Sequence, residues 1–135
     1  MEDLKVLIVD DDPLVVATYE AAFDDAGFLV KSETSATDAF AVLQVFKPDV
    51  VILDLNMPGA NGLSWLAAAR QLPELEGLPV VVVTAASADS PEFTAAQAAG
   101  VQGVLHKKFW TPESLVAAAR WAAHHRGVTP LEHAA

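Results

Sequence analysis

The segment VVILDLNMPG, residues 50–59, places an aspartate directly after an unbroken apolar run. Its first residues are β-branched or leucine and show no polar alternation, which is typical of a strand buried on both faces. A carboxylate at the end of such a strand costs free energy unless a cation or hydrogen-bond donors compensate it. The segment therefore predicts a buried strand over residues 50–54 that delivers Asp54 to a structural, metal-binding or covalent site.

Working outward, four more apolar runs resemble this strand, and segments of helical periodicity separate them. Strands are predicted over residues 4–10, 28–33, 78–85 and 103–107. Helices bounded by prolines, glycines or capping residues are predicted over residues 13–27, 36–48, 62–72, 90–100 and 111–127. Strict alternation of five strands and five helices predicts an α/β fold with a doubly wound parallel sheet and helices on both faces.

Composition narrows the class of protein. A chain of 135 residues with 53% hydrophobic residues is one domain with enough apolar side chains for a core. A net charge of -10 with only eight basic residues argues against direct binding of nucleic acid or an anionic membrane. No cysteine is present, so disulfides and thiolate metal sites are excluded. The charged first residues do not resemble a signal peptide, and no run is long enough to span a bilayer.

Two expectations follow about location and domain organisation. The absence of a leader and of a spanning segment predicts a cytoplasmic protein. Residues 1–127 are expected to form the domain. Residues 128–135, VTPLEHAA, lose all periodicity, so they are expected to be a frayed tail or the cut edge of a longer protein.

Polar residues stand at the carboxyl ends of four predicted strands. They are Asp10, Asp11 and Asp12 after the first strand, Asp54 and Asn56 at the third, Thr84 at the fourth, and Lys107 with Lys108 at the fifth. In open α/β sheets the ligand site lies outside these ends, where the strand order reverses. The sequence therefore predicts that these side chains gather in one crevice.

Converging carboxylates repel one another unless a cation lies among them or some are protonated. Oxygen ligands without cysteine favour a hard ion, and Mg²⁺ suits a solvent-facing crevice because it keeps several waters and binds one or two carboxylates plus a phosphate. The lysine and the threonine then provide a cation and a hydroxyl for an anion. That anion is most simply a phosphoryl group.

The motifs VLIVDDDP, VVILDLNMPGANG, VVVVTA and the lysine of GVLHKKF, in this order, resemble the response-regulator receiver domain of two-component signalling. The match covers residues 4 to about 126. The resemblance implies a CheY-like, flavodoxin-like sheet of order 2-1-3-4-5 and phosphorylation of one aspartate by a histidine kinase or a histidine phosphotransfer protein. It also implies a downstream protein partner that senses a change in the surface near the fourth and fifth strands.

Carried over residue by residue, the phospho-acceptor is Asp54. Asp11 matches the direct Mg²⁺ ligand and Asp10 the acid that usually reaches the metal through water, while Asn56 would contribute its backbone carbonyl. Thr84 and Lys107 would each contact a phosphoryl oxygen. A receiver is a phosphoacceptor rather than a turnover enzyme, and we expect a monomer or a weak dimer.

Three positions depart from the family pattern. A proline usually follows the lysine, often after a cis peptide bond, but here the residue is Lys108. A cis bond before a non-proline residue costs roughly 2.5 to 4 kcal/mol, so either a trans linkage with a shifted loop or a strained cis linkage is expected. Val104 replaces the aromatic switch residue, and His106 replaces a small polar residue before the lysine. A receiver that has lost phosphorylation is one alternative.

Two further alternatives belong to other classes. An aspartate-nucleophile phosphatase needs a second acid two residues after the nucleophile, and that position is Asn56. A flavin-binding module of the same fold needs a phosphate-binding loop after the first strand, where DDDPL instead presents carboxylates.

Overall fold

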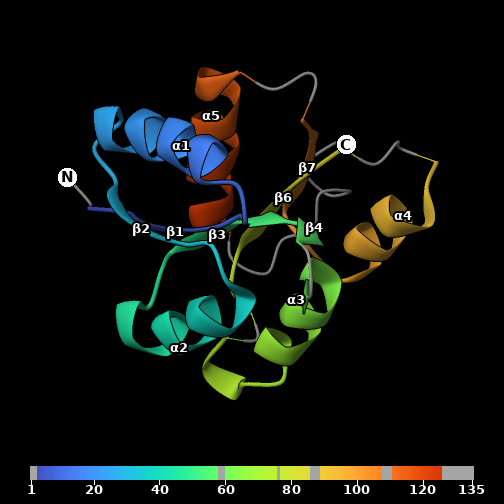
Figure 1. Cartoon of the computed structure of the whole chain (residues 1–135). Helices are drawn as coiled ribbons and strands as arrows, with labels where there is room; N and C mark the ends of the chain where they lie inside the picture. The colour runs from blue at the N-terminus through green and yellow to red at the C-terminus, as the bar shows by residue number, and fades with distance from the viewer. Residues whose placement is uncertain (1–2, 58–59, 76, 86–88, 108–110, 126–135) are drawn as a thin grey trace.

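Five parallel strands form the central sheet of the protein (Figure 1), which a computed structural model describes over residues 3–57, 60–75, 77–85, 89–107 and 111–125. Their order is β2-β1-β3-β6-β7. The strands are β1 (Lys5–Val9), β2 (Leu29–Glu33), β3 (Val50–Asp54), β6 (Val80–Thr84) and β7 (Gly103–His106). Counted along these five strands, the order is 2-1-3-4-5, so the sheet topology predicted from the sequence is confirmed.

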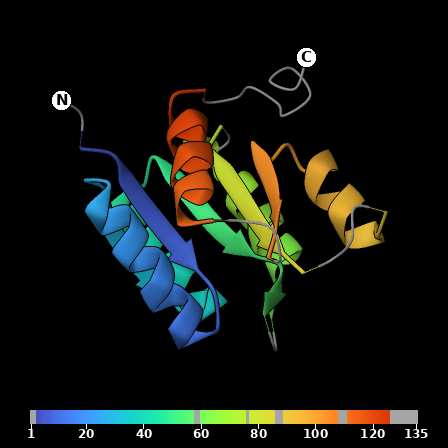
Figure 2. The same ribbon diagram turned by 90° about the horizontal axis from the view of Figure 1, so that it is seen from above.

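Helices cover both faces of the sheet (Figures 1 and 2). One face carries α1 (Pro13–Asp25) and α5 (Pro112–Ala123). The other carries α2 (Ala36–Phe46), α3 (Gly62–Arg70) and α4 (Pro91–Ala98). The five predicted helices are all present. None of the described helices is both long and apolar enough to cross a membrane.

Two hydrophobic layers sandwich the sheet because successive strand residues point to opposite faces. Leu7, Val9 and Leu53 pack against the helices α2 and α3, whereas Ile8 and Ile52 pack against α1 and α5. The strands β3 and β6 are buried at every position, which explains their unbroken apolar sequences. Packing on both faces therefore fixes the positions of the carboxyl ends of β3 and β6.

Local caps determine where the helices begin. Asp12 is the N-cap of α1, and its Oδ1 accepts a hydrogen bond of 2.9 Å from the backbone N–H of Leu14. Thr111 and Ser114 form a reciprocal capping box at the start of α5. Prolines in the first turns of α1, α4 and α5 add no unsatisfied N–H there.

Two features of the chain were not predicted from the sequence. A short antiparallel hairpin of β4 (Asn56–Met57) and β5 (Ala60–Asn61) follows β3, and a 3-10 helix (Pro73–Leu75) follows α3. Strands of two residues have no detectable periodicity, and the pairing depends on the turn between them. Residues 58–59, between these two short strands, lie outside the described residues.

Gly62 begins α3 against the backbone of the third strand. A Cβ atom at this position would lie 2.7 Å from the carbonyl oxygen of Asp54 and 2.8 Å from Cα of Leu55. Because both neighbours are backbone atoms, we expect Gly62→Ala to lower the free energy of unfolding by about 1–3 kcal/mol. Urea denaturation measures this change.

Gly103→Ala is the matched control for this prediction. A Cβ atom there would meet only the side chain of Val81, at 3.8 Å. That distance is an ordinary van der Waals contact, so stability should not fall by a comparable amount. Equal stability of the two variants would contradict the steric role of Gly62.

Candidate functional site

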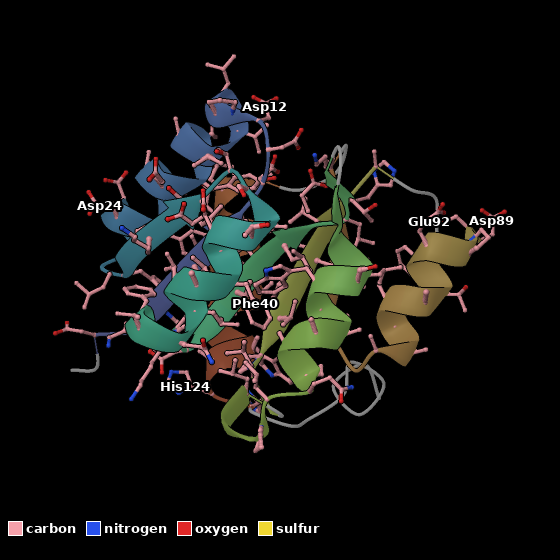
Figure 3. The ribbon with its side chains drawn as sticks, turned by 60° about the horizontal axis from the view of Figure 1, so that its bottom comes forward. Asp12, Asp24, Phe40, Asp89, Glu92 and His124 are labelled. Carbon is pink, nitrogen blue, oxygen red and sulfur yellow. The ribbon has the colours of Figure 1, made fainter. Side chains whose placement is uncertain are left out.

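Several of the polar residues predicted to gather lie at the carboxyl edge of the sheet. Asp10 follows β1, Asp54 ends β3, Thr84 ends β6 and Lys107 follows β7. The strands are parallel, so these four ends lie at one edge of the sheet. Figure 3 shows Asp12 at the start of α1, next in sequence to the acidic residues of the site.

Lys107 bridges the two buried aspartates. Its Nζ lies 3.2 Å from Oδ2 of Asp54 and 3.8 Å from Oδ2 of Asp10. The backbone N–H of Lys107 donates a hydrogen bond of 2.8 Å to the carbonyl oxygen of Thr84, which continues the ladder between β6 and β7 past its last strand residue. This backbone bond fixes the main chain of Lys107 at the end of β7, from where its side chain reaches Asp54.

Three carboxylates converge at the same place. One oxygen from each of Asp10, Asp11 and Asp54 lies within 4.8 Å of the others. The exposed fractions of Asp10 and Asp54 are only 1% and 2%. A site made of hard oxygen ligands, close together and poorly solvated, fits a divalent cation such as Mg²⁺.

Asp10 has one oxygen that the protein does not satisfy with a hydrogen bond. Its Oδ1 accepts a hydrogen bond of 2.9 Å from the backbone N–H of Asp12. Its buried Oδ2 accepts none from the described residues, and its contact with Lys107 at 3.8 Å is an ion pair only. An unsatisfied buried carboxylate oxygen is costly, and a cation or a metal-bound water would compensate it.

The pKa of the Asp10 carboxyl is raised from 3.8 to about 6, chiefly because the group is buried. The nearby charges of Asp54 and Asp11 contribute to this rise, whereas the N–H of Asp12 and the Lys107 ammonium partly offset it. Burial also raises the pKa of the Tyr19 phenol well above its usual value, with smaller contributions from Asp10 and Asp54. Tyr19 therefore stays neutral beside the acidic cluster.

This pKa predicts how stability depends on pH without Mg²⁺. The folded protein binds the Asp10 proton more tightly than the unfolded chain, so protonation stabilises the fold below pH 3.8 and this contribution is lost as the pH rises through about 6. Asp10→Asn is neutral at every pH. Asp10→Asn should therefore be more stable than wild type at neutral pH. This difference in the free energy of unfolding should vanish as the pH falls below 3.8, where Asp10 is protonated in both states.

Urea titrations across this pH range, with a chelator present, measure the effect. Asp12→Asn is the control because asparagine also caps a helix and the Asp12 side chain is exposed. A difference between Asp10→Asn and wild type that grows toward acid pH would contradict the raised pKa.

Two of the three positions that depart from the family pattern, Val104 and His106, lie on one face of β7. Val104 pairs in register with Val82 and packs against the core on the α4 side, and His106 pairs with Thr84. The buried threonine thus has a half-buried histidine as its register neighbour, where receiver domains usually have a small polar residue. Lys108 and its linkage to Lys107 lie outside the described residues, so the prediction about that peptide bond remains a prediction.

Asn56 starts β4 two residues beyond Asp54, with its backbone paired to Asn61. Its proposed role as a carbonyl ligand remains a prediction. The tail, residues 128–135, lies outside the described residues.

Sequence reasoning missed Tyr19 as a neighbour of the site. Val16, Tyr19 and Phe23 are the buried residues of α1, at helical spacings of three and four. That spacing could have shown that Tyr19 faces the sheet. It could not have shown that the phenol lies close enough for Asp10 and Asp54 to affect its pKa.

Comparison with known proteins agrees with this geometry. The sequence profile described as the response regulator receiver domain matches residues 6–120. Response regulator Rre1 of Synechocystis is 34% identical over 120 residues, which are 88% of this chain and 51% of that protein. Chemotaxis protein CheY of Pseudomonas aeruginosa is 36% identical over 107 residues, 78% of this chain and 86% of that protein.

Solved structures show the same fold. Vibrio cholerae CheY4 superposes with a TM-score of 0.81 at 30% identity and covers 90% of this chain and 99% of its own. A putative response regulator from Chloroflexus aurantiacus superposes with a TM-score of 0.83 at 29% identity, covering 91% and 99%. The chain spans about half the length of the first curated relatives it matches, such as Rre1 at 51%.

Proposed function

The chain belongs to the response regulator receiver domain family, and from this we propose that Asp54 accepts a phosphoryl group from a histidine kinase or a histidine phosphotransfer protein. One observation supports this most directly. The Lys107 ammonium lies 3.2 Å from Asp54, at the edge of a cluster of three carboxylates. An aspartate beside a cation and a divalent-metal site is suited to attack a phosphoryl group.

In the proposed reaction an oxygen of Asp54 forms a bond to phosphorus while the phosphorus–nitrogen bond of the donor phosphohistidine breaks. The imidazole leaves and an acyl phosphate remains on Asp54. No general base is needed once the carboxylate is ionised. Catalysis is therefore a matter of positioning and of stabilising charge on the transferring group.

The residues of the chain would divide these tasks. Lys107 would leave its ion pair with Asp54 and contact a phosphoryl oxygen, and Thr84 would donate its hydroxyl to another. Asp10, Asp11, Asp54 and the carbonyl of Asn56 would hold Mg²⁺. When bound, Mg²⁺ supplies positive charge that offsets the charge of the phosphoryl oxygens.

Phosphorylation would then act as a switch. Redirecting Lys107 and Thr84 toward a phosphoryl group would change the strand ends of β6 and β7, and with them the surface that a downstream protein binds. We infer a phosphoacceptor rather than a turnover enzyme, acting in the cytoplasm as a monomer or weak dimer. The signal would then pass on through reversible binding of the phosphorylated protein to its downstream partner.

Intact-protein mass spectrometry after incubation with acetyl phosphate tests the proposal. We expect one phosphoryl adduct that forms with Mg²⁺, does not form with a chelator, and is removed by hydroxylamine as an acyl phosphate. An adduct that resists hydroxylamine, or forms equally without Mg²⁺, would refute the proposed chemistry. An acetyl adduct has a different mass and so is not confused with it.

A further inference from the structure

A groove lies between α2 and the edge strand β2, far from the acidic site. Its volume is about 540 Å³, and it is lined by Lys5, Lys31, Ala41, Val42, Val45 and Phe46. Lys5 begins β1 and Asp10 follows that strand, so about 16 Å of extended chain separates the two. The groove therefore does not belong to the phosphorylation site.

The groove has an exposed apolar wall. Val45 on α2 is 85% exposed, and Leu29, the register neighbour of Lys5, is 49% exposed. They are two of the three large hydrophobic residues that are exposed in the described part of the chain. Val45 lines the groove, and Leu29 lies on the same face of β2 as Lys31, so the two residues extend the exposed apolar surface of the groove.

The same groove is rich in lysine although the chain is acidic. Lys5 and Lys31 line the groove, and Lys47 is the C-cap residue of α2; they are three of the eight basic residues in a chain with net charge -10. Lys5 is engaged within the fold, because its Nζ donates a hydrogen bond of 3.3 Å to the carbonyl oxygen of Phe46 and lies over the Phe46 ring. Lys31, exposed on β2, faces the groove.

The backbone of β2 presents an open edge beside the groove. Leu29 donates to the carbonyl of Leu4 and the carbonyl of Glu33 accepts from Asp10, so both residues direct their backbone groups toward β1. In a parallel ladder these directions alternate along the strand, so Val30 and Ser32 direct theirs outward. No described strand pairs with that edge.

The side chain of Lys31 on β2 points to the face of the sheet that carries α2. Lys31 pairs in register with Leu7, whose side chain packs on the α2 side of the sheet. A further strand beyond β2, at about 4.8 Å, would therefore place alternate side chains over Lys31 and the wall formed by Val42 and Val45. Figure 1 shows α2 as the outermost described helix on this side, and Figure 3 views this face with Phe40 of α2 labelled.

We propose that this groove binds an extended segment of a partner protein, which adds as a strand along β2 and presents apolar and acidic side chains toward α2. The backbone groups of Val30 and Ser32 supply hydrogen bonds, and Val42 and Val45 supply apolar contact. Lys31 selects an acidic segment and repels a basic one. A lysine on an edge strand discourages pairing with like strands, so the same residue disfavours a second copy of this groove as the occupant.

This surface goes beyond phosphorylation of Asp54 and does not depend on it. A partner docked at β2 leaves the carboxyl edge of the sheet free. Binding at the groove should therefore be the same with and without Mg²⁺ and the phosphodonor. Failure of the proposed phosphorylation of Asp54 and failure of the proposed binding at β2 can therefore be recognised separately.

Two synthetic peptides test the proposal. The first, Val-Thr-Glu-Thr-Val, places valine, glutamate and valine on one face of an extended strand, and the second replaces the glutamate with lysine. Titrated into the full chain and followed by amide NMR, the glutamate peptide should bind at least about tenfold more tightly. The amides of Val30 and Ser32 should shift and exchange more slowly with solvent.

Variants locate the contact. Val45→Asp should weaken binding of the glutamate peptide by about tenfold or more, because it removes apolar contact and adds a like charge. Leu14→Asp, at a residue that is 80% exposed on α1, is the matched control and should leave binding unchanged. Lys31→Glu should reverse the preference between the two peptides.

Several results would overturn the proposal. Equal binding of the two peptides to wild type would remove the role of Lys31. Shifts on α2 without protection of the β2 amides would show that the peptide binds in the groove without adding as a strand. Concentration-dependent self-association that protects the same amides in the chain alone would assign the groove to a second copy.

Discussion

Asp54→Asn is expected to abolish the acyl phosphate completely under conditions in which the wild type is fully modified. The side chain keeps its shape at the end of β3, where it is buried between Asp10 and Lys107. An amide, however, is neutral and has no oxygen nucleophile comparable to a carboxylate. The loss therefore reports on the nucleophile and not on the fold, and intact mass after treatment with acetyl phosphate and Mg²⁺ measures it.

Asp12→Asn is the matched control for this prediction. It makes the same chemical change two residues from Asp10, but Asp12 caps α1 and lies outside the three-carboxylate cluster. Asparagine can accept the same hydrogen bond from Leu14. We expect this variant to be phosphorylated as fast as the wild type. An adduct that persists in Asp54→Asn would place the acceptor elsewhere and refute the proposed function.

Lys107→Met is expected to slow adduct formation by about 10²-fold. One preorganised cationic donor at the site of developing charge contributes roughly this much in comparable active sites. Methionine has a similar length and no charge, so it removes the ammonium that lies 3.2 Å from Asp54 and 3.8 Å from Asp10. The initial rate at saturating Mg²⁺ measures the effect.

Mg²⁺ affinity gives this prediction a second, independent measurement. Removing Lys107 leaves the buried carboxylates without their cation, so Lys107→Met should bind Mg²⁺ more tightly than wild type although it reacts more slowly. Lys31→Met, at a lysine on β2, is the control and should change neither quantity. A rate within about twofold of wild type would show that Lys107 does not reach the transferring phosphoryl group. The replacement of the usual proline by Lys108 would then be the first explanation to test.

The fold was largely predictable because its signals are local. The unbroken apolar runs of β3 and β6, and the prolines and caps that begin α1, α4 and α5, are visible in the sequence itself. The alternation of elements and the handedness of crossovers gave a doubly wound parallel sheet, whereas the order of the strands came from the resemblance to receiver domains. The hairpin of β4 and β5 was missed because its two-residue strands depend on a turn rather than on a pattern.

The sequence predicted which residues form the candidate site, but not their environment. Asp10, Asp11, Asp54, Thr84 and Lys107 were found because polar residues at the ends of apolar strands are conspicuous. Three properties of the site could not be predicted: the raised pKa of Asp10, its unsatisfied Oδ2 and the nearness of Tyr19. Each of them depends on burial and on distances between segments that are far apart in the chain. The expected strand order already placed β2 at an edge of the sheet, but the groove between β2 and α2 could not be seen until α2 was in place.

The sequence by itself thus determined the five strands of the central sheet and the five α-helices. It also determined which carboxylates, hydroxyl and ammonium stand at the strand ends. Those properties depend on periodicity and on the chemistry of neighbours along the chain. Only the tertiary structure decided that Lys107 contacts both Asp54 and Asp10, and that Lys31 lies beside Val42 and Val45. Contacts of this kind join residues far apart in sequence, and the packing of helices on the sheet sets their distances and their exposure to water.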